Sequence, residues 1–212
     1  MKQGNRYAVP GDEGMFEPGS NELVLKNFLG IVDPSEMNLI ETELLDALYM
    51  HVFENFPEKI TFSTISHWHK MWLGNVYSWA GELRTVNMSK PDIDFATPSQ
   101  IQRLAENFET LLREFQHLPE LSDPELFSFL SKLHVEFILI HPFREGNGRI
   151  SRLLLDVMSV KSGLEPLDYS LWDEHKEFYF KAIQAGRDGE LMHLERLVRD
   201  VILGQGSSTS QG

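Results

Sequence analysis

Apolar residues recur every three or four positions along most of the chain, and this period is typical of amphipathic α-helices. Such stripes cover residues 39–48, 61–79, 101–115 and 126–140. The second half of the last stretch is apolar on nearly every side, which indicates a helix at the centre of a bundle. Three further helices are predicted after it, at residues 150–161, 174–185 and 191–203.

Local signals mark the ends of these helices. Residues 33–36 (DPSE) place a capping acid before a proline and a second acid in the first turn, and residues 122–125 (SDPE) repeat this start. The central helix must end near His141, because Pro142 cannot donate the next helical hydrogen bond. Gly163 is the expected C-cap of the helix that follows.

The helical period breaks between residues 82 and 96. Leu83, Thr85 and Val86 favour a strand, and residues 90–92 (KPD) favour a turn. We therefore expect a short β-hairpin in this segment. The fold class that follows is all-α, a helical bundle with one small hairpin.

Composition restricts the class of protein. The 212 residues are 42% hydrophobic, which suits one globular domain. A formal net charge of −13 repels phosphate backbones, so general nucleic-acid binding is not expected. The absence of cysteine excludes thiol catalysis, disulfides and Cys-ligated zinc.

The two ends differ in composition from the rest of the chain. We expect an extended, Gly- and Pro-rich arm at residues 1–20, one domain at residues 21–203 and a flexible polar tail at residues 204–212. No apolar run reaches about 18 residues, so no membrane span is expected. The first residues lack the apolar core of an export signal, and a cytoplasmic location is expected.

One connection between two apolar helices contains more ionisable, amide and glycine residues than a simple connecting loop requires. Residues 141–152 read HPFREGNGRISR. The free N–H groups at the start of the following helix attract anions. Gly146 and Gly148 let the backbone wrap closely around a phosphate, and Asn147 between them tolerates left-handed turns and offers its amide to the same anion.

Charged residues of the same loop can complete a nucleotide site. Arg149 and Arg152 are three apart and so are expected on one helix face, which suits a di- or triphosphate. Glu145 is a hard oxygen ligand, and Mg²⁺ takes one or two carboxylates together with phosphate oxygens. His141 is the group that can accept a proton near pH 7. Each residue alone is more often a helix-end partner, a turn or a surface charge, but their combination favours the site.

The loop resembles the signature of Fic (Fido) domain proteins, H-P-F-x-[D/E]-G-N-G-R-x-x-R. Two more segments look like parts of that family: LKNFLGI at 25–31 like its N-terminal lead-in, and WAGELRTVNMSKPDIDFA at 79–96 like the segment with its substrate-docking flap. The likeness covers roughly residues 20–200. The specified signature positions are filled by His141, Pro142, Phe143, Glu145, Gly146, Asn147, Gly148, Arg149 and Arg152.

The resemblance implies a protein adenylyltransferase on a Fic-type helical bundle. Such an enzyme moves AMP from ATP to a Tyr, Thr or Ser hydroxyl of a target protein and releases pyrophosphate. His141 would then deprotonate the hydroxyl, and Glu145 would hold Mg²⁺. The flap, at about residues 82–96, would pair with an extended target segment. The phosphates would be bound by Gly146, Asn147, Gly148, Arg149 and Arg152.

The chain departs from many family members in lacking an inhibitory motif, [S/T]-x-x-x-E-[G/N]. Thr110 and Ser170 each precede a glutamate by four positions, but phenylalanine and histidine follow where glycine or asparagine is required. The resemblance then implies either no self-inhibition or an inhibitory helix supplied by a separate small antitoxin protein, and the second is preferred. Delivery into another cell as an effector fits the same family.

Proteins with the same fold have other activities, which remain alternatives for this chain. Relatives transfer UMP, phosphocholine or phosphate, although Gly148 disfavours the phosphate-transferring branch, which has lysine there. A pseudoenzyme or interaction module that only binds nucleotide is a second alternative. A metal-dependent hydrolase would need a third metal ligand beside His134 and His141, and none is evident. His134 suits a buried structural role better. His67 and His69 point to different helix faces and are expected to be packing or surface residues.

Overall fold

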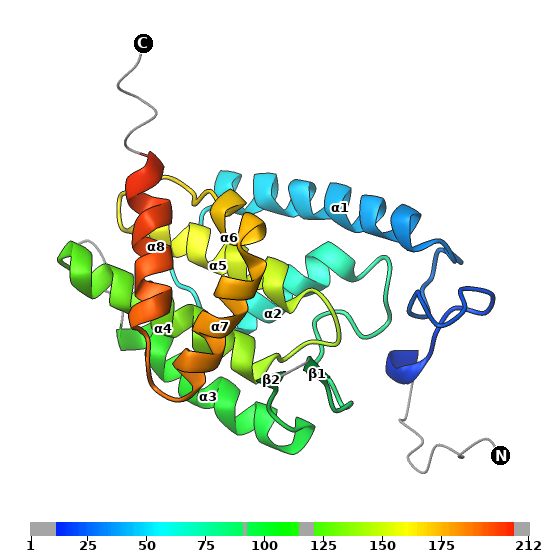
Figure 1. Cartoon of the computed structure of the whole chain (residues 1–212). Helices are drawn as coiled ribbons and strands as arrows, with labels where there is room; N and C mark the ends of the chain where they lie inside the picture. Colours follow the sequence, from blue (N-terminus) through cyan, green and yellow to red (C-terminus); the bar gives the residue numbers. More distant parts are fainter. Residues whose placement is uncertain (1–11, 91–92, 115–120, 206–212) are drawn as a thin grey trace.

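The computed structural model describes residues 12–90, 93–114 and 121–205. Within these ranges it contains eight α-helices, one short 3-10 helix and a two-stranded antiparallel sheet (Figure 1). The predicted all-α bundle with one small hairpin is confirmed. The elements are η1 (Asp12–Gly14), α1 (Pro34–Glu54), α2 (Phe62–Leu73), β1 (Ser89–Lys90), β2 (Ile93–Asp94), α3 (Pro98–Glu114), α4 (Asp123–Ile140), α5 (Asn147–Lys161), α6 (Ser170–Glu174), α7 (Lys176–Arg187) and α8 (Met192–Gln205).

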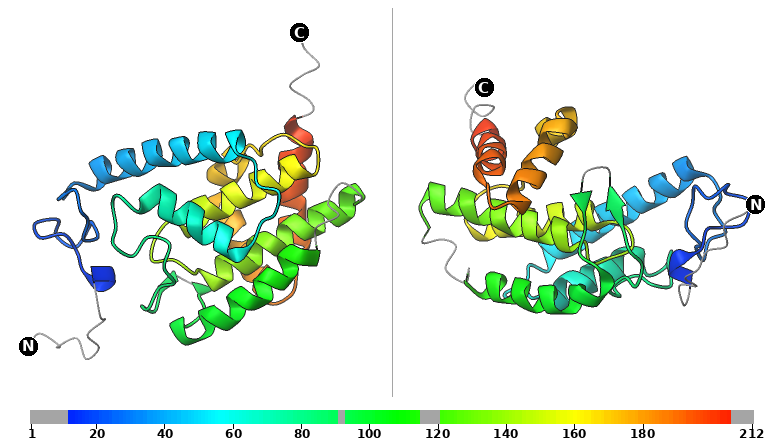
Figure 2. Two further views of the ribbon diagram at one scale, coloured as in Figure 1. Left: turned by 180° about the vertical axis from the view of Figure 1, so that it is seen from behind. Right: turned by 60° about the horizontal axis from the view of Figure 1, so that its bottom comes forward.

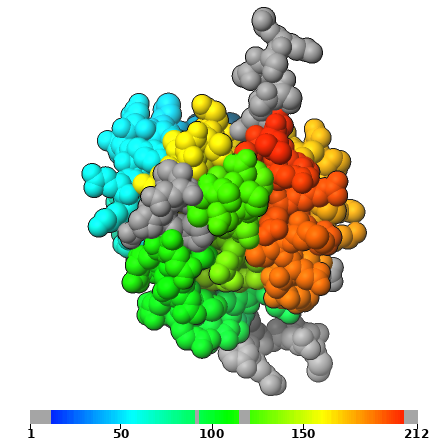
Figure 3. All heavy atoms as spheres, turned by 90° about the vertical axis from the view of Figure 1, so that its left-hand side faces the viewer, coloured from blue at the N-terminus to red at the C-terminus, as the bar shows by residue number. Residues whose placement is uncertain are grey.

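Helix α4 occupies the centre of the bundle, as its all-round apolar surface predicts. It packs against α3, α5, α7 and α8, and α2 bridges α1, α3 and α5 (Figure 2). On one face of the molecule α8 lies directly against α4 (Figure 3). The buried α4 side chains include Leu126, Phe129, Leu130, Leu133, Phe137 and Ile140.

The predicted helix starts are confirmed by their hydrogen bonds. Asp33 Oδ1 accepts from the backbone N–H groups of Ser35 and Glu36 at 2.8 and 2.9 Å. At the start of α4, Glu125 Oε2 accepts from the backbone N–H and the hydroxyl of Ser122, at 2.9 and 2.7 Å. Both helices therefore begin where the sequence chemistry places them.

Some helix limits differ from the predicted ones. Helix α2 ends at Leu73 rather than near residue 79, because Gly74 caps it and tight turns follow. Helix α5 begins at Asn147, three residues before the expected start. The short helix α6 was not predicted. Asp168 supports its start by accepting from the backbone N–H and hydroxyl of Ser170 at 2.9 and 2.6 Å.

The hairpin is shorter than its sequence pattern suggests. The two strands hold two residues each, paired Ser89 with Asp94 and Lys90 with Ile93. Residues 91–92 of the predicted turn lie outside the described residues. Residues 83–86 do not join the sheet, although their composition favours a strand. Their backbone is bonded instead to the arm and to the signature loop, as described below.

The two ends of the chain are only partly described. Residues 1–11 of the predicted arm and 206–212 of the predicted tail lie outside the described residues. The remainder of the arm forms η1 and folds back through one bridge between Phe16 and Leu25, so it packs on the domain. The domain limits themselves stay a prediction. None of the described helices is long and apolar enough to cross a bilayer.

Candidate active site

His141 follows α4 directly and adopts a left-handed backbone with φ of 47°. Its Nδ1 lies 3.1 Å from the Ile138 carbonyl oxygen, and since a carbonyl only accepts, Nδ1 carries the hydrogen. Nε2 is therefore the unprotonated nitrogen. The ring stacks on Phe95 with 3.7 Å between centroids. Burial, assisted by the charges of Lys90 and Arg84, lowers the pKa of His141 to about 3, so the imidazole is neutral at pH 7.

The side chain of Asn147 closes the turn between His141 and α5. Its Oδ1 accepts from the Phe143 N–H at 2.9 Å, and its Nδ2 donates to the Phe143 carbonyl at 2.7 Å. Phe143 is fully buried and stacks on the ring of His69 at 4.0 Å. Both polar atoms of the Asn147 side chain therefore bond the loop backbone, whereas the sequence suggested that this amide would contact the anion.

Glu145 and Gly146 form the bend before α5. The Glu145 carboxylate accepts from the Gly146 N–H at 2.9 Å and is 46% exposed. The Glu145 carbonyl accepts from His69 Nε2 at 3.0 Å, and His69 Nδ1 accepts from the Gly81 N–H at 2.8 Å, so this buried ring is neutral. Burial lowers its pKa to about 4. Gly146 has φ of 79°, and a Cβ added there would lie 2.5 Å from Trp72, so only glycine fits.

The first turn of α5 faces open space. Within the described part of the chain, the backbone N–H groups of Asn147, Gly148 and Arg149 have no hydrogen-bond acceptor. A Cβ added at Gly148 would meet no heavy atom within 4 Å. Free N–H groups and the positive end of the helix dipole together make this turn a site for an anion.

Arg149 is held toward α1. Its Nη2 lies 2.7 Å from Glu41 Oε2, and the guanidinium lies 4.6 Å from the centre of the Trp72 ring. Glu41 is buried, and its other carboxylate oxygen accepts from the Tyr77 hydroxyl at 2.7 Å. The same Nη2 lies 3.6 Å from Glu145 Oε1. A buried carboxylate therefore fixes the direction of this arginine.

Arg152 is held by a different element. Its two Nη atoms donate to the carboxylate of Asp173 on α6 at 3.0 and 2.7 Å, and its guanidinium lies 4.8 Å from the centre of the Tyr169 ring. Asp173 is half-exposed. Arg149 and Arg152 both line the cavity, but they pair with acids on α1 and α6, so they diverge more than their three-residue spacing suggests.

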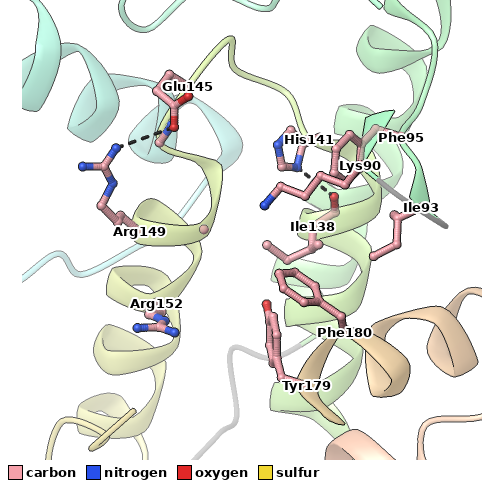
Figure 4. A pocket seen from close by; sticks show the side chains of 12 residues that line it. Lys90, Ile93, Phe95, Ile138, His141, Glu145, Arg149, Arg152, Tyr179 and Phe180 are labelled. Carbon is pink, nitrogen blue, oxygen red and sulfur yellow. Dashed lines mark hydrogen bonds and ion pairs between the residues drawn. The ribbon is translucent and has the colours of Figure 1, made fainter. Parts of the chain in front are cut away.

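A cavity of about 310 Å³ lies between these elements (Figure 4). Glu145, Arg149 and Arg152 lie on the α5 side, and His141 lies on the opposite side with the flap. The structure thus brings six of the seven predicted site residues to the cavity lining, whereas the seventh, Asn147, is buried and does not line it. The remaining lining residues are Lys90, Ile93, Phe95, Ile138, Tyr179 and Phe180.

Three supporting residues were not predicted from the sequence. Arg84 is buried and donates to the carbonyl oxygen of His141 at 2.6 Å, which ties that backbone to the flap base. His69 bonds Glu145, as described above. Glu41 lies four residues after buried Met37 on α1, so the two side chains share one helix face. This spacing is the sequence signal that could have identified Glu41 as a buried acid.

The geometry does not support a metal-hydrolase site built on His134. This residue is buried and both ring nitrogens have partners, the Ser151 hydroxyl at 2.7 Å and the Tyr179 hydroxyl at 2.8 Å. No group of three or more His, Cys, Asp or Glu side chains among the described residues is arranged to hold a metal ion. His134 is a structural residue, as its position in the central helix suggested.

Comparison with known proteins places this fold and loop in one family. The Fic/DOC family model matches residues 59–159, which include nearly all of α2 to α5 and the whole signature loop. The chain is 29% identical over 197 residues to the probable protein adenylyltransferase y4lH of Sinorhizobium fredii, covering 90% of this chain and 96% of that protein. It is 31% identical over 144 residues to the protein adenylyltransferase VbhT of Bartonella schoenbuchensis, but spans only 30% of that protein.

Solved structures share the fold. The N-terminal Fic domain of a Bartonella effector protein from Bartonella sp. AR 15-3 superposes with a TM-score of 0.78 at 23% identity, covering 96% of this chain and 97% of that chain. The BepC protein with bound AMPPNP from Bartonella tribocorum gives 0.73 at 21% identity, covering 91% and 98%. The complete signature and the matched family model agree, and the solved structures share the fold: the chain contains a Fic/DOC domain at residues 59–159.

Proposed function

We propose that this protein is a protein adenylyltransferase, which transfers AMP from ATP to a Tyr, Thr or Ser hydroxyl of a target protein. One observation carries the proposal. One cavity is lined by a neutral histidine whose acceptor nitrogen has no hydrogen-bond partner among the described residues, and the N-terminus of α5 lines the opposite side. The curated relatives named above as protein adenylyltransferases support the same activity.

The phosphates of ATP would bind at the start of α5. The N–H groups of residues 147–149 and the helix dipole supply the anion site, and Gly148 leaves space for close approach. Arg149 would donate to the phosphates from the α1 side and Arg152 from the α6 side. Each would use guanidinium N–H groups that are not bonded to its carboxylate partner. The BepC structure contains bound AMPPNP, an ATP analogue, which supports ATP as substrate.

Glu145 is the residue proposed to hold Mg²⁺. Its carboxylate is nearly half-exposed beside the anion site, and Mg²⁺ takes few protein ligands when phosphates supply the others. The ion would then arrive with the nucleotide. When bound, Mg²⁺ neutralises phosphate charge and so stabilises the departing pyrophosphate.

His141 would act as the general base. The target oxygen attacks the α-phosphorus, its proton passes to His141 Nε2, and the bond from the α-phosphorus to the bridging oxygen breaks, so that pyrophosphate leaves. The hydrogen bond from Nδ1 to the Ile138 carbonyl keeps Nε2 in the accepting form. An extended target segment paired with the edge of the flap would align its hydroxyl in the cavity.

Regulation by a separate small antitoxin protein is part of the proposal. It rests on the missing inhibitory motif. The protein would work in an ATP-containing compartment, either its own cytoplasm or a second cell, as the Bartonella neighbours described as translocated effectors suggest. Purified protein that labels itself or a target without an activator fits either a separate antitoxin or a chain without self-inhibition. Activity that appears only after Glu41→Gln or Asp173→Asn would contradict both.

The decisive experiment is incubation of a cell lysate with labelled ATP, UTP, GTP or CDP-choline, in parallel for the wild type and His141→Ala. We expect labelled protein with ATP, and loss of label by about 10²–10⁴-fold in the variant, which is the usual contribution of a general base. Label from UTP or CDP-choline instead would assign a different transferred group. No transfer from any donor, with ATP still bound, would leave a nucleotide-binding module.

A further inference from the structure

A buried carboxylate from the N-terminal arm contacts two parts of the site. Glu13 lies in η1 and is 6% exposed. Its carboxylate accepts from the Thr85 N–H at 3.0 and 2.9 Å and from the Thr85 hydroxyl at 2.6 Å. Its backbone carbonyl accepts from Arg144 Nε at 3.0 Å. Thr85 belongs to the base of the flap and Arg144 to the signature loop, so one arm residue joins both.

The segment that Glu13 holds is the link between the flap and His141. Arg84 donates through its backbone N–H to the Pro142 carbonyl at 2.8 Å and through Nε to the His141 carbonyl at 2.6 Å. Its Nη2 donates to the Ala96 carbonyl at 2.6 Å, at the far end of the flap. Any movement of residues 84–86 therefore shifts the flap relative to the catalytic histidine.

We propose that Glu13 is a positioning residue, through which the N-terminal arm fixes the flap against the signature loop. The inference rests on the proposed function, because the flap is where the target would dock. Glu13 touches neither the first turn of α5 nor Arg149 or Arg152, so it acts on placement of the target hydroxyl and not on the nucleotide.

The neighbourhood of Glu13 explains why a charged residue stands here. Among the described residues, the buried guanidinium of Arg84 donates to carbonyl oxygens alone, and Glu13 is a nearby acid that compensates its charge. The carboxylate also accepts from both Thr85 donors, and a carboxamide cannot accept with both of its polar atoms. Glu13→Gln therefore places an NH₂ group against a donor while keeping the side-chain shape.

The test compares Glu13→Gln with Thr85→Val, which removes only the hydroxyl bond, and with Glu22→Gln, an exposed acid two residues after the arm. Hydrogen exchange at residues 84–90 is expected to accelerate about tenfold in Glu13→Gln, less in Thr85→Val and not at all in Glu22→Gln. Exchange at residues 147–152 stays unchanged. Calorimetry is expected to give the same dissociation constant for an ATP analogue within twofold, while the rate of AMP transfer from labelled ATP to lysate protein falls about tenfold.

Two results would overturn the inference. One is unchanged exchange at residues 84–90 in Glu13→Gln. The other is a loss of nucleotide affinity as large as the loss of transfer, which would make Glu13 a general structural residue. If the wild type itself transfers nothing, the proposed function fails, but exchange and nucleotide binding still decide the role of Glu13.

Discussion

Removing the charge of Arg149 should destabilise the protein far more than removing that of Arg152. Both arginines pair with a carboxylate at 2.7 Å, yet the Glu41 side chain is 7% exposed and that of Asp173 is 48% exposed. Arg149→Met and Arg152→Met keep most of the aliphatic stem and remove the guanidinium, which lies over Trp72 or Tyr169. The matched pair therefore isolates the loss of the cation.

The magnitude follows from the burial of the acid that is left behind. A buried carboxylate deprived of its partner costs about 3–5 kcal/mol. Arg149 is 30% exposed, so water can partly replace the guanidinium, and we expect about 2–3 kcal/mol. The exposed Asp173 is solvated by water once alone, so Arg152→Met should cost about 0–1 kcal/mol. The difference is about 1–3 kcal/mol, which for a chain of this length corresponds to roughly 2–12 °C in Tm.

The assay is urea unfolding of the nucleotide-free variants followed by tryptophan fluorescence, with Glu41→Gln and the double variant Glu41→Gln/Arg149→Met completing a cycle. Neutralising Glu41 should make Arg149→Met less costly by about 1–2 kcal/mol, because no buried charge then remains. Equal costs for the two arginine variants would refute the reasoning. So would a double variant whose cost equals the sum of the single ones.

Three further predictions address the loop and its surroundings. Gly148→Ala should leave Tm unchanged and weaken nucleotide binding about tenfold, whereas Gly146→Ala, which collides with Trp72 at a positive φ, should lower stability by about 1–3 kcal/mol; calorimetry and thermal unfolding separate the two effects. Because the pKa of His141 is lowered to about 3, the base stays neutral and kcat/KM should show no limb from its protonation between pH 5 and 8; a limb near pH 6.5 would contradict this. Burial raises the pKa of Asp156 to about 6 from an unfolded value of 3.8, so the folded state gains stability from protonated Asp156 at low pH and loses it as pH rises through 6. The stability of the wild type relative to Asp156→Asn should therefore fall by up to about 3 kcal/mol between pH 4 and 8 in urea titrations, and a pH-independent difference would oppose the assignment.

The features predicted correctly are those that neighbouring residues determine. The helix starts at Asp33 and Ser122 depend on bonds spanning three residues, and the stop after Ile140 depends on the proline that follows His141. The bond that closes the signature loop is also local, because Asn147 lies only four positions after Phe143, although the sequence analysis assigned the Asn147 amide to the anion. Such contacts are visible in sequence spacing.

The features that were missed depend on contacts between distant residues. Thr85 has strand propensity, but its donors are satisfied by Glu13, 72 positions earlier, and not by a neighbouring strand. The direction of Arg149 is set by Glu41, more than a hundred positions away, and spacing along α5 alone cannot reveal it. Tertiary partners therefore override the local pattern at both places.

The proposed function depends on ATP binding at the start of α5 and on His141 directing a hydroxyl at its α-phosphorus. The most direct measurement compares ATP labelled at the α-phosphate with ATP labelled at the γ-phosphate, each incubated with a lysate and the wild-type protein. Relative to the same lysate without the added protein, in which endogenous kinases still transfer γ-phosphate, we expect additional protein-bound label from the α-position only, and none with His141→Ala. Additional label from the γ-position, or additional α-label that persists in His141→Ala, would contradict the proposed reaction.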